Sequence, residues 1–319
     1  FDQYGIKVPE NYEEYVQVCQ QFYDKGIKPY SMDLAEDWSN QEIIQAAAIG
    51  EFTSLDGIDW RNKAETSAGE IKFDDVLWKR IFSETSQFLK DSHFSEEDIN
   101  VNSNTGTQMF VEGKSAMFHG QPTDMQKLQD QMDAELIRIP YFSQTSDSSF
   151  VYMFPSLNIA FNKELEKNQE KLDTALDVLD CMNSEQGQKL IADGSGVISL
   201  NIDVPSMMED VPGLEDEISD NSVYIRYSAQ KSFDASLEAV HGLLSGKMDA
   251  TQAYNVFRNV MNSKDTEEKA TVNFEHKYSI SLNDKNGRDA ASSILTTIRK
   301  ENDAQLAFAP YYYFTSSVY

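Results

Sequence analysis

The stretch from Phe150 to Val204 constrains the fold of this chain more than any other segment. Apolar residues alternate from Val151 to Phe161, a pattern that predicts a β-strand. The apolar residues that follow recur at the three- and four-residue spacing of a helix with one buried face. They are Leu172, Ala175, Leu176, Leu179 and Met182. A second helix is expected to begin at Ser184, and a strand that leads into helices indicates an α/β fold.

The segment from Tyr4 to Met32 predicts a helix followed by a short strand. Asn11 is a favourable N-cap for the helix, and Glu14 stands at the capping-box position. The buried face of this helix is expected to consist of Tyr12, Tyr15, Cys19 and Phe22. Gly26 should end the helix before a strand at residues 27–30.

The segment from Phe110 to Gly120, FVEGKSAMFHG, predicts a helix end, a turn at Glu112-Gly113 and a strand from Ser115 to Phe118. An amphipathic helix is expected earlier, at residues 74–90. Its inward-facing side chains are predicted to be Val76, Leu77, Ile81, Phe88 and Leu89. Residues 53–72, by contrast, are rich in turn-forming and acidic residues.

The composition sets limits on partners and chemistry. The 319 residues are enough for two domains, and 53 acidic against 27 basic residues give a net charge of −26. This charge repels nucleic-acid phosphates and anionic membrane surfaces, so neither is expected as a partner. The charge is interpreted mainly as a source of solubility, and a cationic ligand is the alternative.

Enzyme motifs are scarce in the sequence. None of the four histidines stands in a paired metal-ligand spacing, and there is no P-loop, nucleophile elbow or dinucleotide-binding glycine motif. Carboxylates are so numerous that a glycosidase pair stays open. Both cysteines, Cys19 and Cys181, are expected to be free thiols on apolar helix faces. We therefore expect no enzymatic activity, no metal and no cofactor.

Three segments resemble, in order, the extracellular solute-binding proteins of carbohydrate ABC transporters, the group that includes maltose-binding protein. Tyr4–Met32 resembles the G-hydrophobic-x-x-P-x-T-W-x-E entry of that family, which is followed by a helix and a G-I-x-P segment. Phe110–Gly120 resembles its F-x-x-G-K-x-A-M-x-x-G hallmark. Ser184 to Gln188 resembles the Ser-x-x-Gly-Gln junction between two helices. The resemblance covers about two hundred residues of the chain.

The resemblance implies a periplasmic-binding-protein-like two-lobe α/β fold, of which one lobe is incomplete in this chain. Residues 1–150 and 216–262 would build the ligand-binding lobe, and residues 151–215 the return segment of the second lobe. About a hundred further residues would precede Phe1, so the chain is expected to be cut at both ends. Residues 263–319 would form a linker and the start of a small α/β module.

The resemblance also implies a function. The protein would capture a carbohydrate, expected to be an oligosaccharide, in a cleft between the lobes and deliver it to the permease subunits of an ABC transporter. It would be a monomeric, extracellular bacterial lipoprotein attached to the cell surface. One alternative is an exported hydrolase of nucleotides or sugars, because residues 295–308 faintly resemble the C-terminal domain of 5′-nucleotidases. Another is a surface module that binds no ligand.

Sugar binding requires aromatic faces and planar hydrogen-bonding groups, and Trp38 with its neighbour Asp37 is the leading candidate. The resemblance places both at the expected cleft, after the first strand. A tryptophan in the core or on a helix surface is the alternative.

Four further ligand-binding candidates lie elsewhere in the sequence. His119 and Gln121 follow the strand of the FVEGKSAMFHG segment, where a simple helix entry is the alternative. Tyr152 stands on the strand that crosses between the lobes, and Phe233 stands at the start of a later helix. Packing in the core is the alternative for both rings.

Overall fold

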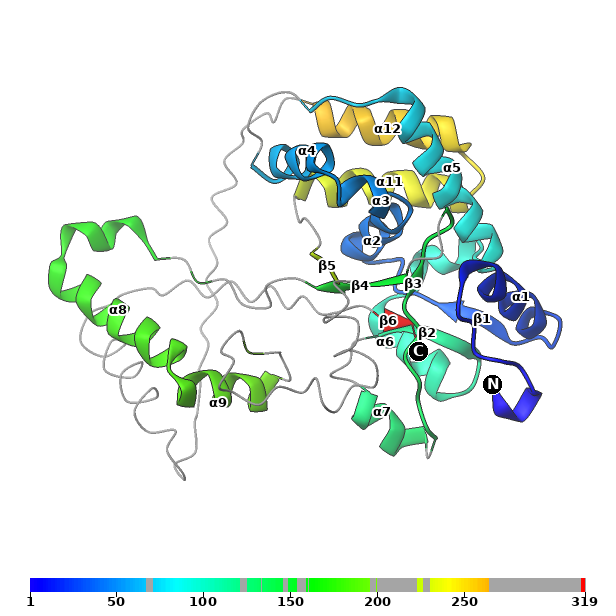
Figure 1. Ribbon diagram of the computed structural model, residues 1–319, viewed down its shortest axis with the longest axis horizontal. Helices are drawn as coiled ribbons and strands as arrows, with labels where there is room; N and C mark the ends of the chain where they lie inside the picture. Colours follow the sequence, from blue (N-terminus) through cyan, green and yellow to red (C-terminus); the bar gives the residue numbers. More distant parts are fainter. Residues whose placement is uncertain are drawn as a thin grey trace. The chain divides into compact units, whose positions relative to one another are not determined.

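The computed structural model describes residues 1–66, 71–120, 125–132, 134–145, 149–153, 159, 161–195, 199, 223–225, 230–263 and 317–318 (Figure 1). The chain forms two compact units. Unit 1 comprises Phe1–Phe154, Glu215–Asp265 and Thr315–Tyr319, and unit 2 comprises Pro155–Leu214 and Thr266–Phe314. The assignment of the segments to a ligand-binding lobe and a return segment stays a prediction.

The first part of unit 1 alternates short strands with helices. Its elements are η1 (Asp2–Tyr4), α1 (Tyr12–Tyr23), β1 (Lys28–Ser31), α2 (Asp37–Ala47), α3 (Ile49–Phe52), α4 (Leu55–Thr66), α5 (Asp75–Asp91), η2 (Glu96–Asn100), α6 (Ser103–Val111) and β2 (Ser115–Gly120). Later elements of the unit are α7 (Met125–Met132), β3 (Tyr141–Phe142), β4 (Ser149–Met153), β5 (Val223–Ile225), α11 (Gln230–Leu244), α12 (Ala250–Asn262) and β6 (Ser317–Val318).

Two small sheets organise unit 1. In the first sheet, β1 and β2 run parallel with Tyr30 opposite Met117, and β6 pairs antiparallel on the other side of β2. In the second sheet, β4 lies between antiparallel β3 and parallel β5, with Tyr152 opposite Tyr224. Because β1 and β2 are parallel, their carboxyl ends lie at one edge of the sheet, and the residues that follow them are brought together there.

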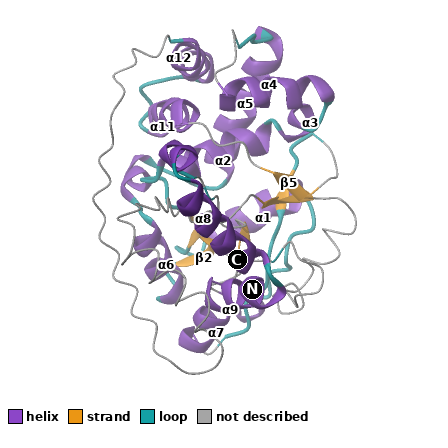
Figure 2. Ribbon diagram, turned by 90° about the vertical axis from the view of Figure 1, so that its left-hand side faces the viewer, coloured by secondary structure: helices purple, strands orange, loops and turns teal. Residues whose placement is uncertain are grey.

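Helices α2, α5, α11 and α12 pack against one another and enclose an aromatic core (Figures 1 and 2). Trp78 on α5 stacks on Phe257 of α12 with ring centroids 5.3 Å apart. Phe82 and Phe257 are fully buried and 5.4 Å apart. Burial of such rings contributes more than their area alone, because edge and stacked contacts add to the hydrophobic term.

Helix α1 confirms the predicted N-cap at Asn11, but the capping box differs from the prediction. The Asn11 side chain accepts a hydrogen bond from the Glu14 N–H at 2.9 Å, as an N-cap should. The Glu14 carboxylate, however, accepts from the backbone N–H of Glu10 instead of closing the capping box on Asn11. Tyr15, Cys19 and the other expected apolar side chains face inward, and Val18 joins them.

Helix α5 begins after Asp74, which caps it, but its buried face differs from the prediction. Val76 is 83% exposed, whereas Trp78 and Phe82 are buried. Val76 lies in the first turn of α5 and is exposed there, so its apolar side chain is not a sign of burial. The stripe that faces the core contains Trp78, Ile81, Phe82, Thr85 and Leu89.

The described part of unit 2 consists of η4 (Lys163–Lys167), α8 (Gln169–Asn183) and α9 (Glu185–Ser195). Ala175 and Val178 are buried on α8, but Leu176 is 41% exposed, so its predicted burial is wrong. The stripe is therefore narrower than the spacing of apolar residues suggested. The expected strand from Val151 to Phe161 is confirmed only up to Met153, because most of its later residues lie outside the described ones.

The junction between α8 and α9 shows why the Ser-x-x-Gly pattern is needed there. The Ser184 hydroxyl oxygen accepts a hydrogen bond from the Gly187 N–H at 3.1 Å and so caps the start of α9. A Cβ on residue 187 would lie 2.1 Å from the carbonyl oxygen of Cys181, closer than atoms can approach. Only glycine permits this close contact of the two helices.

Replacing Trp78 with alanine is expected to lower the free energy of unfolding by about 3–5 kcal/mol, because it opens a cavity among packed rings. Val76→Ala, on the same helix, is the matched control and should change stability by less than about 0.5 kcal/mol. Urea unfolding measures both variants. Equal losses in the two would contradict the packing of α5 described above.

Candidate functional site

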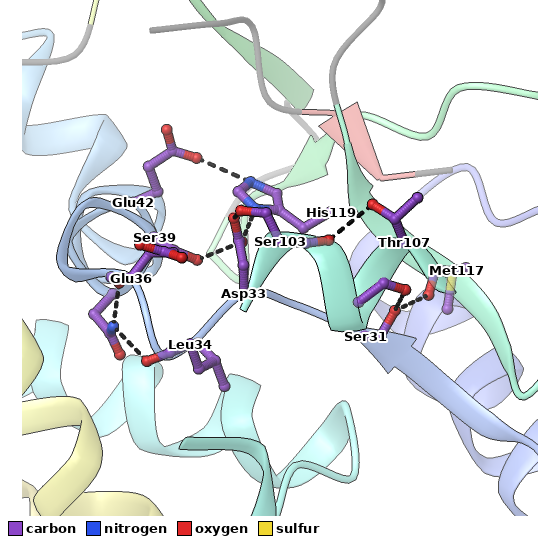
Figure 3. A network of polar contacts seen from close by, with 12 residues as sticks. Ser31, Asp33, Leu34, Glu36, Ser39, Glu42, Ser103, Thr107, Met117 and His119 are labelled. Carbon is purple, nitrogen blue, oxygen red and sulfur yellow. Dashed lines mark hydrogen bonds and ion pairs between the residues drawn. The ribbon is translucent and has the colours of Figure 1, made fainter. Parts of the chain in front are cut away.

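Polar side chains gather where β1 and β2 end. Asp33 follows β1, His119 belongs to the end of β2, and Glu42 comes from α2, the helix that follows β1 (Figure 3). In open α/β sheets, ligands bind outside the carboxyl ends of the strands. This edge is therefore the candidate ligand-binding site of unit 1.

His119 lies between two carboxylates. Its Nδ1 is 2.6 Å from Oδ1 of Asp33, and its Nε2 is 3.1 Å from Oε2 of Glu42 (Figure 3). The three side chains are nearly inaccessible, with exposed fractions of 2%, 5% and 0%. The imidazolium form of the ring has an N–H on each nitrogen and can donate to a carboxylate on either side.

The pKa values of the cluster follow from its geometry. Burial lowers the pKa of His119, but the neighbouring Asp33 and Glu42 carboxylates outweigh burial and raise it to about 9. Burial alone would raise the pKa of Asp33. The imidazolium of His119 and the hydroxyls of Ser103 and Ser39 outweigh it and hold that pKa below its ordinary value.

Further hydrogen bonds fix the conformation of the loop between β1 and α2. The hydroxyls of Ser39 and Ser103 each donate to Asp33 at 2.9 Å. Asn40 Nδ2 donates to the carbonyl oxygens of Leu34 and Glu36 at 3.0 and 2.7 Å. The loop is thus fixed from β2, from α6 and from α2 itself.

Trp38 stands in the first turn of α2, directly after this loop. It is half-buried, and its ring centroid lies 5.3 Å from that of His119 with the planes tilted by 32°. Asp37 precedes it, and the Asp37 carboxylate accepts a hydrogen bond from the Trp38 N–H at 2.7 Å. The structure therefore brings together three of the predicted site residues, Trp38, Asp37 and His119, at one sheet edge.

The other predicted site residues have different surroundings. Tyr152 is fully buried, and its hydroxyl donates to the backbone carbonyl of Glu42. Phe233 is 4% exposed on α11. Gln121 lies outside the described residues. Direct ligand contact by these three residues stays a prediction that the geometry leaves untested.

Sequence reasoning missed two members of the cluster, Asp33 and Glu42. Each is one acidic residue among 53, so composition and spacing gave no reason to select it. Their burial is the distinguishing signal, because carboxylates are almost never fully buried unless they are paired. That signal exists only in the folded chain.

A cavity of about 20 Å³ lies at a separate place, between α1, α2 and residues 140–144. Its lining includes Tyr15, Ile43 and Phe88. This volume holds about one water molecule, so it is too small for a sugar. Across the part of the chain that the structure describes, no group of His, Cys, Asp and Glu side chains could hold a metal ion, and no helix is long and apolar enough to cross a membrane.

No family model and no curated protein matches this sequence. Solved structures do match. A family 1 extracellular solute-binding protein from Bifidobacterium longum subsp. infantis is 16% identical, with a TM-score of 0.59 over 81% of this chain and 67% of that chain. The maltose/maltodextrin-binding domain MalE of Bdellovibrio bacteriovorus, bound to maltotriose, is 16% identical, with a TM-score of 0.55 over 82% and 67%. A chitin oligosaccharide binding protein is 15% identical, with a TM-score of 0.58 over 82% and 66%.

These similarities establish the class of fold. The chain has the two-lobe α/β fold of extracellular solute-binding proteins, which confirms the fold predicted from the sequence. It spans 66% to 67% of the length of the three structures named above. The expected relation of residues 295–308 to 5′-nucleotidases receives no support from the comparisons, and those residues lie outside the described ones.

The His119 cluster predicts a defined dependence of stability on pH. A folded-state pKa of about 9, above the ordinary 6.5, means that the stabilisation is fully present below pH 6.5 and is lost as the pH rises through 9. The loss should be on the order of 3 kcal/mol. Asp33, whose pKa is lowered, adds stability above its ordinary pKa of 3.8 that is lost on acidification.

Urea unfolding of the wild type between pH 6.5 and 10 measures this loss. His119→Gln should be less stable at neutral pH but should lose most of the slope. His93→Asn is the matched control, because burial lowers the pKa of His93, the opposite direction to that of His119. Its slope should equal that of the wild type. Identical slopes in the wild type and His119→Gln would contradict the charged cluster.

Proposed function

We propose that this chain belongs to an extracellular solute-binding protein that captures a carbohydrate, expected to be an oligosaccharide, and delivers it to the permease of an ABC transporter. The observation that carries the proposal is the position of Trp38. A half-buried indole stands at the carboxyl edge of β1 and β2, on a fold shared with structures described as bound to maltotriose, raffinose and maltose.

The chemistry around Trp38 supports a sugar ligand. An indole face packs against the C–H face of a pyranose, and carboxylates accept hydrogen bonds from its hydroxyls. Glu36 and Asp37 directly precede Trp38, and both are partly exposed. Burial and the neighbouring Asp33 and Asp37 raise the pKa of Glu36. The predicted partners of the ligand are therefore one aromatic face and two acceptor groups.

The same comparisons support a binding protein and not an enzyme, because the structures named above are described as binding proteins. An extracellular location and attachment as a lipoprotein are proposed on the same ground, and one of the matching structures is described as a secreted solute-binding lipoprotein. The monomeric state stays a prediction. The hydrolase alternative has no observation in its favour.

Isothermal titration calorimetry of the purified protein with maltotriose, raffinose and a chitin oligosaccharide tests this proposal. Binding of at least one sugar without release of a product is expected. Trp38→Ala should weaken that binding at least about tenfold, the equivalent of about 1.4 kcal/mol.

Tyr23→Ala is the matched control for this substitution. Tyr23 is 55% exposed at the end of α1 and stacks on His93, away from β1 and β2 carboxyl ends. Its removal should leave the affinity unchanged. Absence of binding to every sugar, or turnover of any of them, would contradict the proposed function.

A further inference from the structure

The start of α2 lacks the usual device that fixes a helix end. Its N-cap is Glu36, whose side chain makes no capping hydrogen bond. Trp38 stands in the first turn and is half-buried. Hydrogen bonds of Asp37, Ser39 and Asn40 hold this turn, and His119 from β2 contacts it as well.

His119 contacts the chain on both sides of Trp38. Its Nδ1 reaches Asp33, in the loop before the tryptophan, and its Nε2 reaches Glu42, in the helix after it. The imidazole ring also lies beside the indole, with the centroids 5.3 Å apart. One side chain from β2 thus touches the loop, the helix and the aromatic ring that the loop and helix present.

The charged and titratable groups that surround this arrangement come from several elements. From β1 and β3, the buried phenols of Tyr30 and Tyr141 interact electrostatically with Glu42. The loop after β1 contributes Asp33 and Glu36, and α2 contributes Asp37 and Glu42. From α11, His241 Nε2 donates to the carbonyl oxygen of Leu34 at 2.6 Å. From α6, the neutral hydroxyl of Ser103 donates to Asp33. His119 bonds to side chains both before and after Trp38, and the Ser39 hydroxyl and the Asn40 amide add hydrogen bonds across the same turn.

We infer that His119 is the positioning residue for Trp38. As an imidazolium joined to Asp33 and Glu42, it fixes the β1–α2 loop and the second turn of α2 together and holds the indole in the orientation that stacks on a sugar. His119 itself is buried, so this role acts through Trp38. The effect on sugar binding rests on the proposed function. The coupling between the His119 and Trp38 rings does not depend on it.

Loss of the proton should open this arrangement. A neutral imidazole has one N–H, so it cannot donate to both carboxylates at once. One of the two links, to the loop or to the helix, is then lost, and the repulsion between two buried carboxylates is no longer balanced. Trp38 then becomes less ordered. Part of the binding free energy of a ligand is used to order the indole, so the affinity falls.

The first test follows Trp38 without any ligand. A protonated imidazole beside an indole quenches its fluorescence, and the difference between wild type and Trp38→Phe isolates the signal of Trp38. This signal should rise with pH around a midpoint of about 9. In Glu42→Gln the midpoint should shift to lower pH, because one of the two carboxylates that hold the proton is gone.

Glu84→Gln is the matched control for this shift. Glu84 lies on α5 and pairs with Arg80 at 2.9 Å, so the variant also removes one paired carboxylate from unit 1. Its fluorescence midpoint should equal that of the wild type. Circular dichroism at each pH confirms that the variants remain folded.

The second test measures the affinity for maltotriose, raffinose and a chitin oligosaccharide at pH 7 and pH 10. If only the protonated form is competent, the apparent Kd should rise about tenfold at pH 10, because about one molecule in ten keeps the proton. Glu42→Gln should already bind more weakly at pH 8, and Glu84→Gln should not.

The two tests separate this inference from the proposed function. A fluorescence transition that shifts in Glu42→Gln supports the role of His119 even if no sugar binds, in which case the proposed function fails alone. A sugar affinity that is constant from pH 7 to 10 overturns the inference while the proposed function stands. A Trp38 signal that does not titrate, or that shifts equally in Glu84→Gln, also overturns it.

Discussion

The structure of unit 1 depends on one buried interaction, the imidazolium of His119 held between the carboxylates of Asp33 and Glu42. Three charges with almost no access to water are stable only as a set, because each carboxylate compensates the same cation and the hydroxyls of Ser39 and Ser103 complete the hydrogen bonds of Asp33. Removing one member leaves an uncompensated buried charge. The interaction joins β2 to the loop after β1 and to α2, which lie on either side of Trp38.

Much of the fold could be predicted from the sequence where local signals were strong. The Asn11 cap, the end of the first helix and the strand after Gly113 all depend on local backbone chemistry. Helix α4 was missed because it has no apolar stripe, and Leu55 is 85% exposed. Scattered tertiary contacts hold it: Trp60 stacks on Phe52 with centroids 5.3 Å apart, and Ala64 is buried in the core. Tertiary contacts of this kind leave no periodic pattern.

The candidate site could be predicted only in part. Trp38 was selected because it offers an aromatic face beside acidic residues and follows the first strand, where the resemblance places the cleft. His119 was selected because it follows the strand of the FVEGKSAMFHG segment. The partners of His119 could not be selected, because an acidic chain offers too many carboxylates. His119 was predicted to contact a ligand. In the structure both of its ring nitrogens lie within hydrogen-bond distance of Asp33 and Glu42, and direct ligand contact stays a prediction. The burial of the ring is a property of the assembled sheet edge.

The nitrogen-15 NMR spectrum of the His119 ring at pH 8, assigned by comparison with His119→Gln, tests the buried charge most directly. Ordinary histidines are largely neutral at this pH, since their pKa is near 6.5. Both ring nitrogens of His119 are expected to show the chemical shifts of a protonated imidazolium. Shifts of a neutral ring with one unprotonated nitrogen would contradict the buried charge on which the loop, the helix and the position of Trp38 depend.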